Sequence, residues 1–132
     1  MAVSQDAIDI LCEVFPDKIS CVLDTPDCIS YVYYDAEGYP AGTAMYGTYI
    51  DTDGTPYVFI YWLGVRYRGC GIGTKILTRL HQQYPMHYFC LGVRRNNDYA
   101  IKFYHKLGYH CSGKYLDDTE FWHFQREPTT GA

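Results

Sequence analysis

The sequence lacks any apolar run near the roughly 18 residues needed to span a bilayer, although 48% of its 132 residues are apolar. Its first fifteen residues, MAVSQDAIDILCEVF, also lack the basic segment and unbroken apolar core of a signal peptide. They are typical of an amphipathic helix over residues 5–15 that Ser4 opens. We therefore expect a soluble, cytoplasmic protein without a membrane partner.

No CxxC pair occurs among the six cysteines, and most of them lie in apolar segments. This distribution suits reduced, buried thiols better than a disulfide framework or a zinc site. We therefore expect no metal. The residues concerned are Cys12, Cys21, Cys28, Cys70, Cys90 and Cys111.

Internal repeats, low-complexity tracts and linkers are also missing. The length fits one domain over residues 1–132, because single domains typically have about 100–150 residues. Only the polar end, residues 127–132, is expected to be a disordered tail. One domain implies a single active site.

Basic residues are scarce in the first part of the chain. Residues 1–53 hold ten acidic residues and one basic residue, Lys18, whereas residues 66–106 hold eight basic residues and one acidic residue, Asp98. Such asymmetry indicates an anionic ligand near the basic segment and a cationic ligand near the acidic one. Ordinary solvated surface explains the acidic half equally well.

The hydrophobic periodicity predicts a mixed α/β fold in the order α-β-β-β-α-β-α-β-β. The segment 56–65 is so rich in apolar residues that it predicts a central strand covered on both faces. Helices are expected over 5–15, 72–83 and about 100–107, with Gly108 as the cap of the last one. Further strands are expected over 28–35, 41–50 and 86–93, followed by a hairpin of 109–116 with 120–127.

A glycine-rich stretch, YRGCGIGTKIL (67–77), joins the central strand to the second helix. A Walker A loop needs glycine directly before Lys-Ser/Thr, but Thr74 separates Gly73 from Lys75. A dinucleotide fingerprint needs a third glycine where Thr74 stands. What remains is a strand, a tight turn and a helix N-terminus, whose unpaired N–H groups form a cradle for a pyrophosphate.

Two motifs resemble the GNAT N-acetyltransferase superfamily. RGCGIG (68–73) is similar to the family signature [Q/R]-x-x-G-x-[G/A], and VRRNNDYAIKFYHKLGY (93–109) is similar to a second segment downstream. The resemblance implies a mixed, mostly antiparallel sheet of about six strands flanked by three helices. The family's first strand has no counterpart here, so an edge of the sheet is absent, replaced or completed by a partner. A homodimer is one arrangement compatible with such an edge.

The resemblance implies acetyl-CoA as the co-substrate. The strand backbone at Leu63 and Val65 would pair with its pantetheine arm, and Asn97 would contact the same arm. Lys106 would meet a phosphate, although a solvated helix face explains this lysine equally well. The pyrophosphate would be bound at the turn by Arg68, Gly69, Cys70, Gly71, Ile72, Gly73 and Thr74.

Acyl transfer to an amine needs a proton donor and a proton acceptor. Tyr104 matches the family position of the general acid that protonates the departing thiolate. The central strand has no acidic residue where many family members have glutamate. The acceptor is therefore open between a water molecule held by a tyrosine and a side chain from elsewhere. The candidates are Tyr57, Tyr61, His87, Asp51 and Asp53.

The sequence therefore predicts an acetyl-CoA-dependent N-acetyltransferase. Its acceptor would be a primary amine, either a small cationic amine or a protein lysine or N-terminus. The alternative is a CoA-binding sensor or interaction module with weak catalysis, which the missing strand and glutamate suggest. Nucleic acid is not expected as a partner, because the net charge is −4 and the cofactor accounts for the basic segment.

Overall fold

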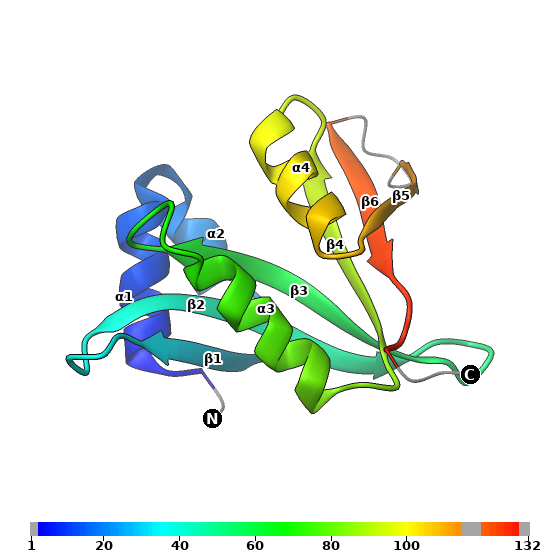
Figure 1. Cartoon of the computed structure of the whole chain (residues 1–132), viewed down its shortest axis with the longest axis horizontal. Coiled ribbons are helices and arrows are strands. Elements are labelled where there is room, and N and C mark those ends of the chain that lie inside the picture. Colours follow the sequence, from blue (N-terminus) through cyan, green and yellow to red (C-terminus); the bar gives the residue numbers. More distant parts are fainter. Residues whose placement is uncertain (1–2, 115–119, 130–132) are drawn as a thin grey trace. The chain divides into compact units, whose positions relative to one another are not determined.

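The computed structural model of the chain describes residues 3–114 and 120–129 (Figure 1). Its strands form one sheet in the order β1-β2-β3-β4-β6-β5. The β3–β4 pair is parallel, and the β1–β2, β4–β6 and β5–β6 pairs are antiparallel. The predicted mixed sheet of six strands is thus confirmed. The elements are α1 (Gln5–Val14), the 3-10 helix η1 (Pro16–Lys18), α2 (Ile19–Leu23), β1 (Ile29–Tyr34), β2 (Pro40–Ile50), β3 (Pro56–Val65), α3 (Ile72–Gln83), β4 (Tyr88–Arg94), α4 (Asp98–Lys106), β5 (His110–Lys114) and β6 (Phe121–Arg126).

The expectation of three flanking helices is corrected to four α-helices within the described residues. The helix missing from the prediction is α2, which follows η1 directly. It has five residues and buries only Val22, so it is too short to show a helical repeat of apolar residues. The other three helices lie where the periodicity predicts them.

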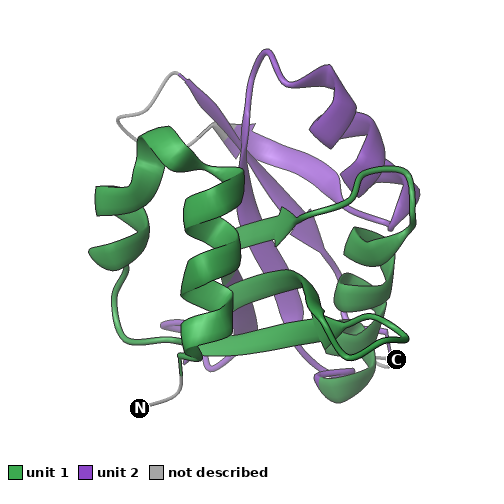
Figure 2. Cartoon of the chain, turned by 90° about the vertical axis from the view of Figure 1, so that its left-hand side faces the viewer, with its two compact units in different colours: residues 1–47, 60–83 green, residues 48–59, 84–132 purple. Residues whose placement is uncertain are grey.

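The chain forms two compact units (Figure 2). Unit 1 comprises residues 1–47 and 60–83, and unit 2 comprises residues 48–59 and 84–132. β2 and β3 each contribute residues to both units. That the whole chain is one domain stays a prediction.

Unit 1 packs α1 against the sheet through a small apolar core. Its buried members are Leu11, Val22, Cys28 and Met45. The ring of Phe15, at the end of α1, lies 5.5 Å from that of Trp62 on β3. Ser4 begins α1 as predicted, since its side chain accepts a hydrogen bond of 3.0 Å from the backbone N–H of Asp6.

Two glycines let helices approach the strands of unit 1 closely. A Cβ atom at Gly64 of β3 would lie 2.8 Å from Leu11 of α1, and one at Gly42 of β2 would lie 2.7 Å from Ile72 of α3. Ile72 is the first residue of α3. The start of that helix is therefore held against the sheet, which fixes one end of the glycine turn.

Unit 2 packs α4 against one face of its strands. Leu91 of β4 and Phe124 of β6 are directly paired and buried, so they share this face with their alternate neighbours. His105 of α4 lies 5.4 Å from the ring of Phe124, and Arg126 Nε donates a 2.9 Å hydrogen bond to the carbonyl of Leu107. The intervening residues of β4 and β6 therefore lie on the face that α4 does not cover.

The six cysteines are free thiols, but only two of them match the predicted burial. Cys28 and Cys90 are buried and Cys12 is half-buried. Cys21, Cys70 and Cys111 are exposed, because they lie at turns and on outward-facing positions of short elements. Among the described residues no group of three or more His, Cys, Asp or Glu side chains could hold a metal ion.

Two further expectations concern the membrane and the tail. Within residues 3–114 and 120–129 there is no helix long and apolar enough to cross a membrane. Glu127 binds His110 at 2.8 Å and Thr129 Oγ1 lies 3.2 Å from Arg126 Nη1, so both side chains contact the unit. The rest of the predicted tail, residues 130–132, lies outside the described residues, as does the predicted turn at 117–119.

Candidate active site

The glycine turn of unit 1 follows β3 and ends where α3 begins. Gly69 and Gly71 have φ angles of 79° and 73°, which side chains with a Cβ atom rarely adopt. A Cβ atom at either position would meet nothing within 4 Å, so the space in front of this backbone is open. Glycine is therefore needed here for its dihedral angles and leaves room for a ligand to reach the main chain.

Backbone N–H groups gather at the start of α3. The hydrogen bond that opens the helix runs from the N–H of Lys75 to the carbonyl of Gly71, at 3.0 Å. The N–H groups of Ile72, Gly73 and Thr74 precede it and point along the helix axis toward the turn. Gly73, unlike the two glycines before it, lies inside the helix. Together with the helix dipole, these groups form an anion-binding end.

The basic side chains around the turn differ in their contacts. Arg66 is tied into unit 1, since its Nε donates to Glu13 at 3.1 Å and its Nη1 donates to the carbonyl of Pro40 at 2.7 Å. Lys75 is exposed, and its Nζ lies 3.4 Å from Tyr33 Oη. Arg68 is exposed at the turn itself. Arg68 and Lys75 can therefore meet an anion, whereas Arg66 holds the turn in place.

The two strand positions expected to face the pantetheine arm, Leu63 and Val65, are half-buried. They alternate with Gly64, whose missing side chain faces Leu11 of α1, so both point to the other side of β3. These residues and the glycine turn all belong to unit 1.

The remaining predicted residues lie on α4 of unit 2. Asn97 is the N-cap of this helix, with its side-chain oxygen accepting a 3.1 Å hydrogen bond from the N–H of Ala100. Its amide group remains the part of the side chain that can donate. Lys106 is exposed at the last position of the helix.

Tyr104 is half-buried in an aromatic cluster on α4. Its ring lies 5.1 Å from Phe103 and 5.4 Å from Tyr109, each in an edge-on arrangement. Burial raises the pKa of the Tyr104 phenol well above its ordinary value of 10.0. The phenol therefore keeps its proton throughout the neutral range.

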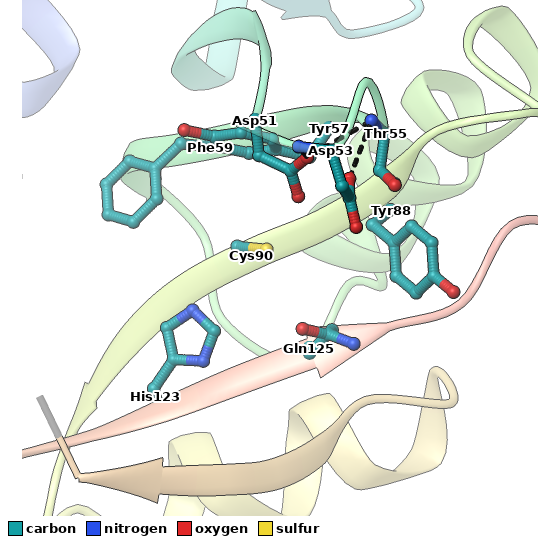
Figure 3. A pocket seen from close by; sticks show the side chains of 9 residues that line it. All are labelled: Asp51, Asp53, Thr55, Tyr57, Phe59, Tyr88, Cys90, His123 and Gln125. Carbon is teal, nitrogen blue, oxygen red and sulfur yellow. Dashed lines mark hydrogen bonds between the residues drawn. The ribbon is translucent and has the colours of Figure 1, made fainter.

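A pocket of about 480 Å³ opens on the face of unit 2 that α4 does not cover. Figure 3 shows that its lining comes from four segments, the hairpin turn after β2, β3, β4 and β6. Tyr57 and Phe59 of β3 line it and are only half-buried. The expectation that β3 is covered on both faces is thus corrected at these positions. The lining residues are Asp51, Asp53, Thr55, Tyr57, Phe59, Tyr88, Cys90, His123 and Gln125.

The structure separates the five candidates for the proton acceptor. Asp51, Asp53 and Tyr57 line the pocket, whereas Tyr61 packs against the apolar core of unit 1. His87 lies 5.2 Å from the ring of Tyr84, and its Nδ1 atom is buried without a hydrogen-bond partner in the described part of the chain. Three of the five candidates therefore come together in one place.

The hairpin turn places its carboxylates at the mouth of the pocket. The N–H of Thr55 donates to Asp51 at 3.1 Å and to Asp53 at 3.0 Å, so both side chains are anchored to the turn (Figure 3). Hydrogen bonding with Asp51 and Thr55 lowers the pKa of Asp53, which is therefore ionised at neutral pH. The two carboxylates give this side of the pocket a negative potential.

Six of the nine pocket residues are absent from the predicted site, and Cys90 and His123 are two of them. Burial, with a smaller effect of the Asp51 charge, raises the pKa of Cys90 to about 11, so this thiol is protonated. Burial lowers the pKa of His123 below 6.5, so its imidazole is neutral at pH 7. The signal that could have found them is the two-residue spacing of Tyr88 with Cys90 and of His123 with Gln125, which places each pair on one face of its strand.

Comparisons with known proteins identify the family of the chain. Residues 6–109 match the acetyltransferase (GNAT) family model. The chain belongs to the GNAT acetyltransferase family. It is 32% identical over 107 residues to a spermine/spermidine N(1)-acetyltransferase of Bacillus subtilis, covering 71% of this chain and 69% of that protein.

Solved GNAT structures share the fold at lower identity. A histone acetyltransferase HPA2-related protein from Corynebacterium glutamicum is 15% identical, with a TM-score of 0.73 over 100% of this chain and 97% of that one. The NatB acetyltransferase complex bound to CoA and MES includes a chain that is 19% identical, with a TM-score of 0.71 over 97% of both. The family membership makes this chain an N-acetyltransferase, which confirms the predicted class of enzyme.

Proposed function

We propose that this GNAT enzyme transfers the acetyl group of acetyl-CoA directly to a primary amine of a small polyamine. The observation that carries the choice of acceptor is the 32% identity to a spermine/spermidine acetyltransferase. Solved relatives whose names specify protein acceptors, such as the ribosomal-protein-S18-alanine N-acetyltransferase of Escherichia coli, are 15% identical and share the fold alone. A small cationic acceptor is therefore favoured over a protein.

The turn of unit 1 fits the pyrophosphate of acetyl-CoA. Its open space at Gly69 and Gly71 allows phosphate oxygens to reach the main chain, and the N–H groups of Ile72 to Thr74 are oriented to donate to them. Arg68 adds a positive charge, and Cys70 contributes its N–H group. In this proposal Leu63 and Val65 offer their backbone to the pantetheine arm.

Residues of α4 complete the proposed cofactor contacts. The Asn97 amide donates to the pantetheine arm while its oxygen caps the helix, so one side chain performs both tasks. Lys106 offers an exposed ammonium to a phosphate. These assignments follow the family pattern, residue by residue.

Tyr104 supplies the proton that the leaving group needs. As the amine nitrogen attacks the thioester carbon, a C–N bond forms and the C–S bond breaks. The thiolate of CoA takes the phenolic proton, and the phenol regains one from the nitrogen through solvent. Because burial raises the pKa of Tyr104, its phenol is fully protonated at neutral pH.

Acetyl-CoA and a panel of amines test the proposal, with release of the CoA thiol as the measurement. The panel contains spermidine, spermine, free amino acids, aminoglycosides and lysine peptides. We expect the highest kcat/KM with spermidine or spermine. Turnover of peptides but not of polyamines would replace the proposed acceptor, and no turnover of any amine would contradict the proposed reaction.

A further inference from the structure

Lys75 of unit 1 stands at a place where a helix does not favour a cation. It belongs to the first turn of α3, at the end that carries the positive pole of the helix dipole. Helix α3 has no acidic residue, and Arg79, four positions further on and also exposed, lies on the same side of the helix. The dipole and the second cation both raise the positive potential around Lys75. This end of α3 therefore suits an anionic ligand.

A tyrosine holds the ammonium of Lys75 in place. Lys75 Nζ lies 3.4 Å from Tyr33 Oη and 5.7 Å from the centre of the Tyr33 ring. The ammonium thus contacts the hydroxyl and lies within the range of about 6 Å over which an aromatic ring attracts a cation. Within residues 3–114 and 120–129 no ion pair involves Lys75. Its position is therefore defined, and its charge is not balanced by a carboxylate of these residues.

The register of the strands places this tyrosine beside α3. Tyr33 of β1 is paired directly with Gly42 of β2, so the two residues share a face of the sheet. That face is the one that α3 covers, since a Cβ atom at Gly42 would lie 2.7 Å from Ile72 of α3. The ammonium of Lys75 is therefore held at the flank of the helix, on the side of β1. The N–H groups proposed to bind the pyrophosphate lie instead at the end of the helix.

The end and the flank of α3 thus offer two places for negative charge within unit 1. The proposed pyrophosphate site at the end uses backbone N–H groups and Arg68. CoA carries in addition a 3′-phosphate on its ribose, a monoester with a charge of about −1.5 to −2 at pH 7. Given the proposed function, which supplies CoA as the ligand, we propose that Lys75, positioned by Tyr33, binds this 3′-phosphate. The two residues thereby distinguish CoA from dephospho-CoA.

Each of the two side chains has its own part in this subsite. Lys75 contacts the phosphate, whose negative charge offsets both the repulsion from Arg79 and the unfavourable place of a cation near the positive pole of the helix. Tyr33 acts through Lys75 and is a positioning residue. A lysine whose ammonium is already held loses less side-chain entropy when it binds a ligand.

Calorimetric titration with CoA and with dephospho-CoA, which lacks only the 3′-phosphate, tests the assignment without turnover. We expect the wild type to bind CoA roughly tenfold more tightly than dephospho-CoA. Lys75→Met keeps an unbranched side chain and removes the charge. It should bind CoA roughly fivefold more weakly, the upper end of what an exposed ion pair contributes, and dephospho-CoA as tightly as the wild type does.

Tyr33→Phe tests the positioning residue, because it keeps the ring and removes the hydroxyl that Lys75 contacts. We expect CoA binding to weaken about twofold, a fraction of the exposed ion pair, and dephospho-CoA binding to stay unchanged. In the Lys75→Met background the same change should have no further effect, since the two side chains act on one phosphate. Equal weakening of both ligands by Tyr33→Phe would mean a structural role and would contradict the positioning role.

Lys102→Met is the matched control for charge. Lys102 is an exposed lysine of α4 that has no part in the proposed cofactor contacts. Its loss should leave the affinities for CoA and dephospho-CoA unchanged. Equal losses of preference in Lys75→Met and Lys102→Met would assign the effect to net charge and overturn the contact at Lys75.

The outcomes separate this inference from the proposed function. If the wild type binds neither CoA nor dephospho-CoA, the proposed function fails. If it binds both equally, or if Lys75→Met weakens both ligands to the same degree or neither of them, the 3′-phosphate assignment is wrong while the function stands. The assignment is also overturned if Lys106→Met, and not Lys75→Met, removes the preference for CoA. A preference lost in Lys75→Met and kept in Lys106→Met and Lys102→Met supports it.

Discussion

The glycine turn of unit 1 and the pocket of unit 2 differ in how they are encoded. The turn is one continuous stretch, 66–74, in which each glycine is readable from the sequence. The pocket gathers nine residues from four segments, of which β4 and β6 are more than 25 positions apart along the chain. We infer that the proposed cofactor site is encoded by a local motif, whereas the pocket depends on the register of the strands.

Tyr104→Phe should give the largest loss of kcat. Tyr104 lies in neither the glycine turn nor the pocket. Removing the phenolic proton is expected to lower kcat roughly 100-fold, because a positioned general acid contributes about 10²–10⁴. KM for both substrates should stay nearly unchanged, since neither the turn nor the pocket is altered. Steady-state kinetics measure this, with Tyr99→Phe, an exposed tyrosine of the same helix, as the control. An unchanged kcat would remove Tyr104 from the mechanism.

Thiol labelling should distinguish the two regions by reactivity. A pKa of about 11 in place of 9.0 lowers the thiolate fraction of Cys90 about 100-fold at pH 7, so iodoacetamide should modify it slowly. Cys70 is exposed in the glycine turn, so it should react faster than Cys90 and be protected by CoA but not by spermidine.

Peptide mass spectrometry over time measures the labelling. The exposed Cys21 of unit 1 is the control and should be modified at the same rate with and without CoA. Protection of Cys70 and Cys21 to the same degree would mean that CoA acts on the protein as a whole rather than at the turn.

Gly71→Ala should weaken acetyl-CoA binding alone, and its effect should be smaller than that of Tyr104→Phe. A Cβ atom at a positive φ costs about 1–2 kcal/mol, and here it also stands in the open space before the helix. We expect KM for acetyl-CoA to rise roughly tenfold, the equivalent of about 1.4 kcal/mol, with KM for spermidine unchanged.

Gly38→Ala controls for the backbone strain. Gly38 has a φ of 88° and equally open surroundings, but it lies in the hairpin between β1 and β2. Both variants should lower the melting temperature similarly, and only Gly71→Ala should change KM for acetyl-CoA. A similar KM increase in both would assign the effect to stability.

The contrast between turn and pocket also explains what the sequence could predict of the fold. Helix α3 was predictable to the residue, because Ile72, Ile76, Leu77 and Leu80 repeat at helical spacing between a glycine turn and Pro85. Helix α2 was not, because five residues hold too few turns to show a period. The prediction of a buried thiol was wrong for Cys70, because its apolar neighbours belong to a turn rather than to a strand.

The acceptor side could be predicted only as a set of candidates. Asp51, Asp53 and Tyr57 were among them because they flank a visible turn. His123 was not, because its place opposite that turn depends on the pairing of Gly92 with His123. Its two-residue spacing from Gln125 indicates only that both lie on one face of a strand. The alternation of half-buried aromatic residues in β3 was equally hidden, because a run of apolar residues is typical of a strand that is buried on both faces.

The most direct test is calorimetric titration of the wild type, Gly71→Ala and Gly38→Ala with CoA. We predict that Gly71→Ala weakens CoA binding roughly tenfold and that Gly38→Ala binds CoA as tightly as the wild type does. If neither variant weakens CoA binding, or if both weaken it equally, the assignment of CoA to the glycine turn is contradicted.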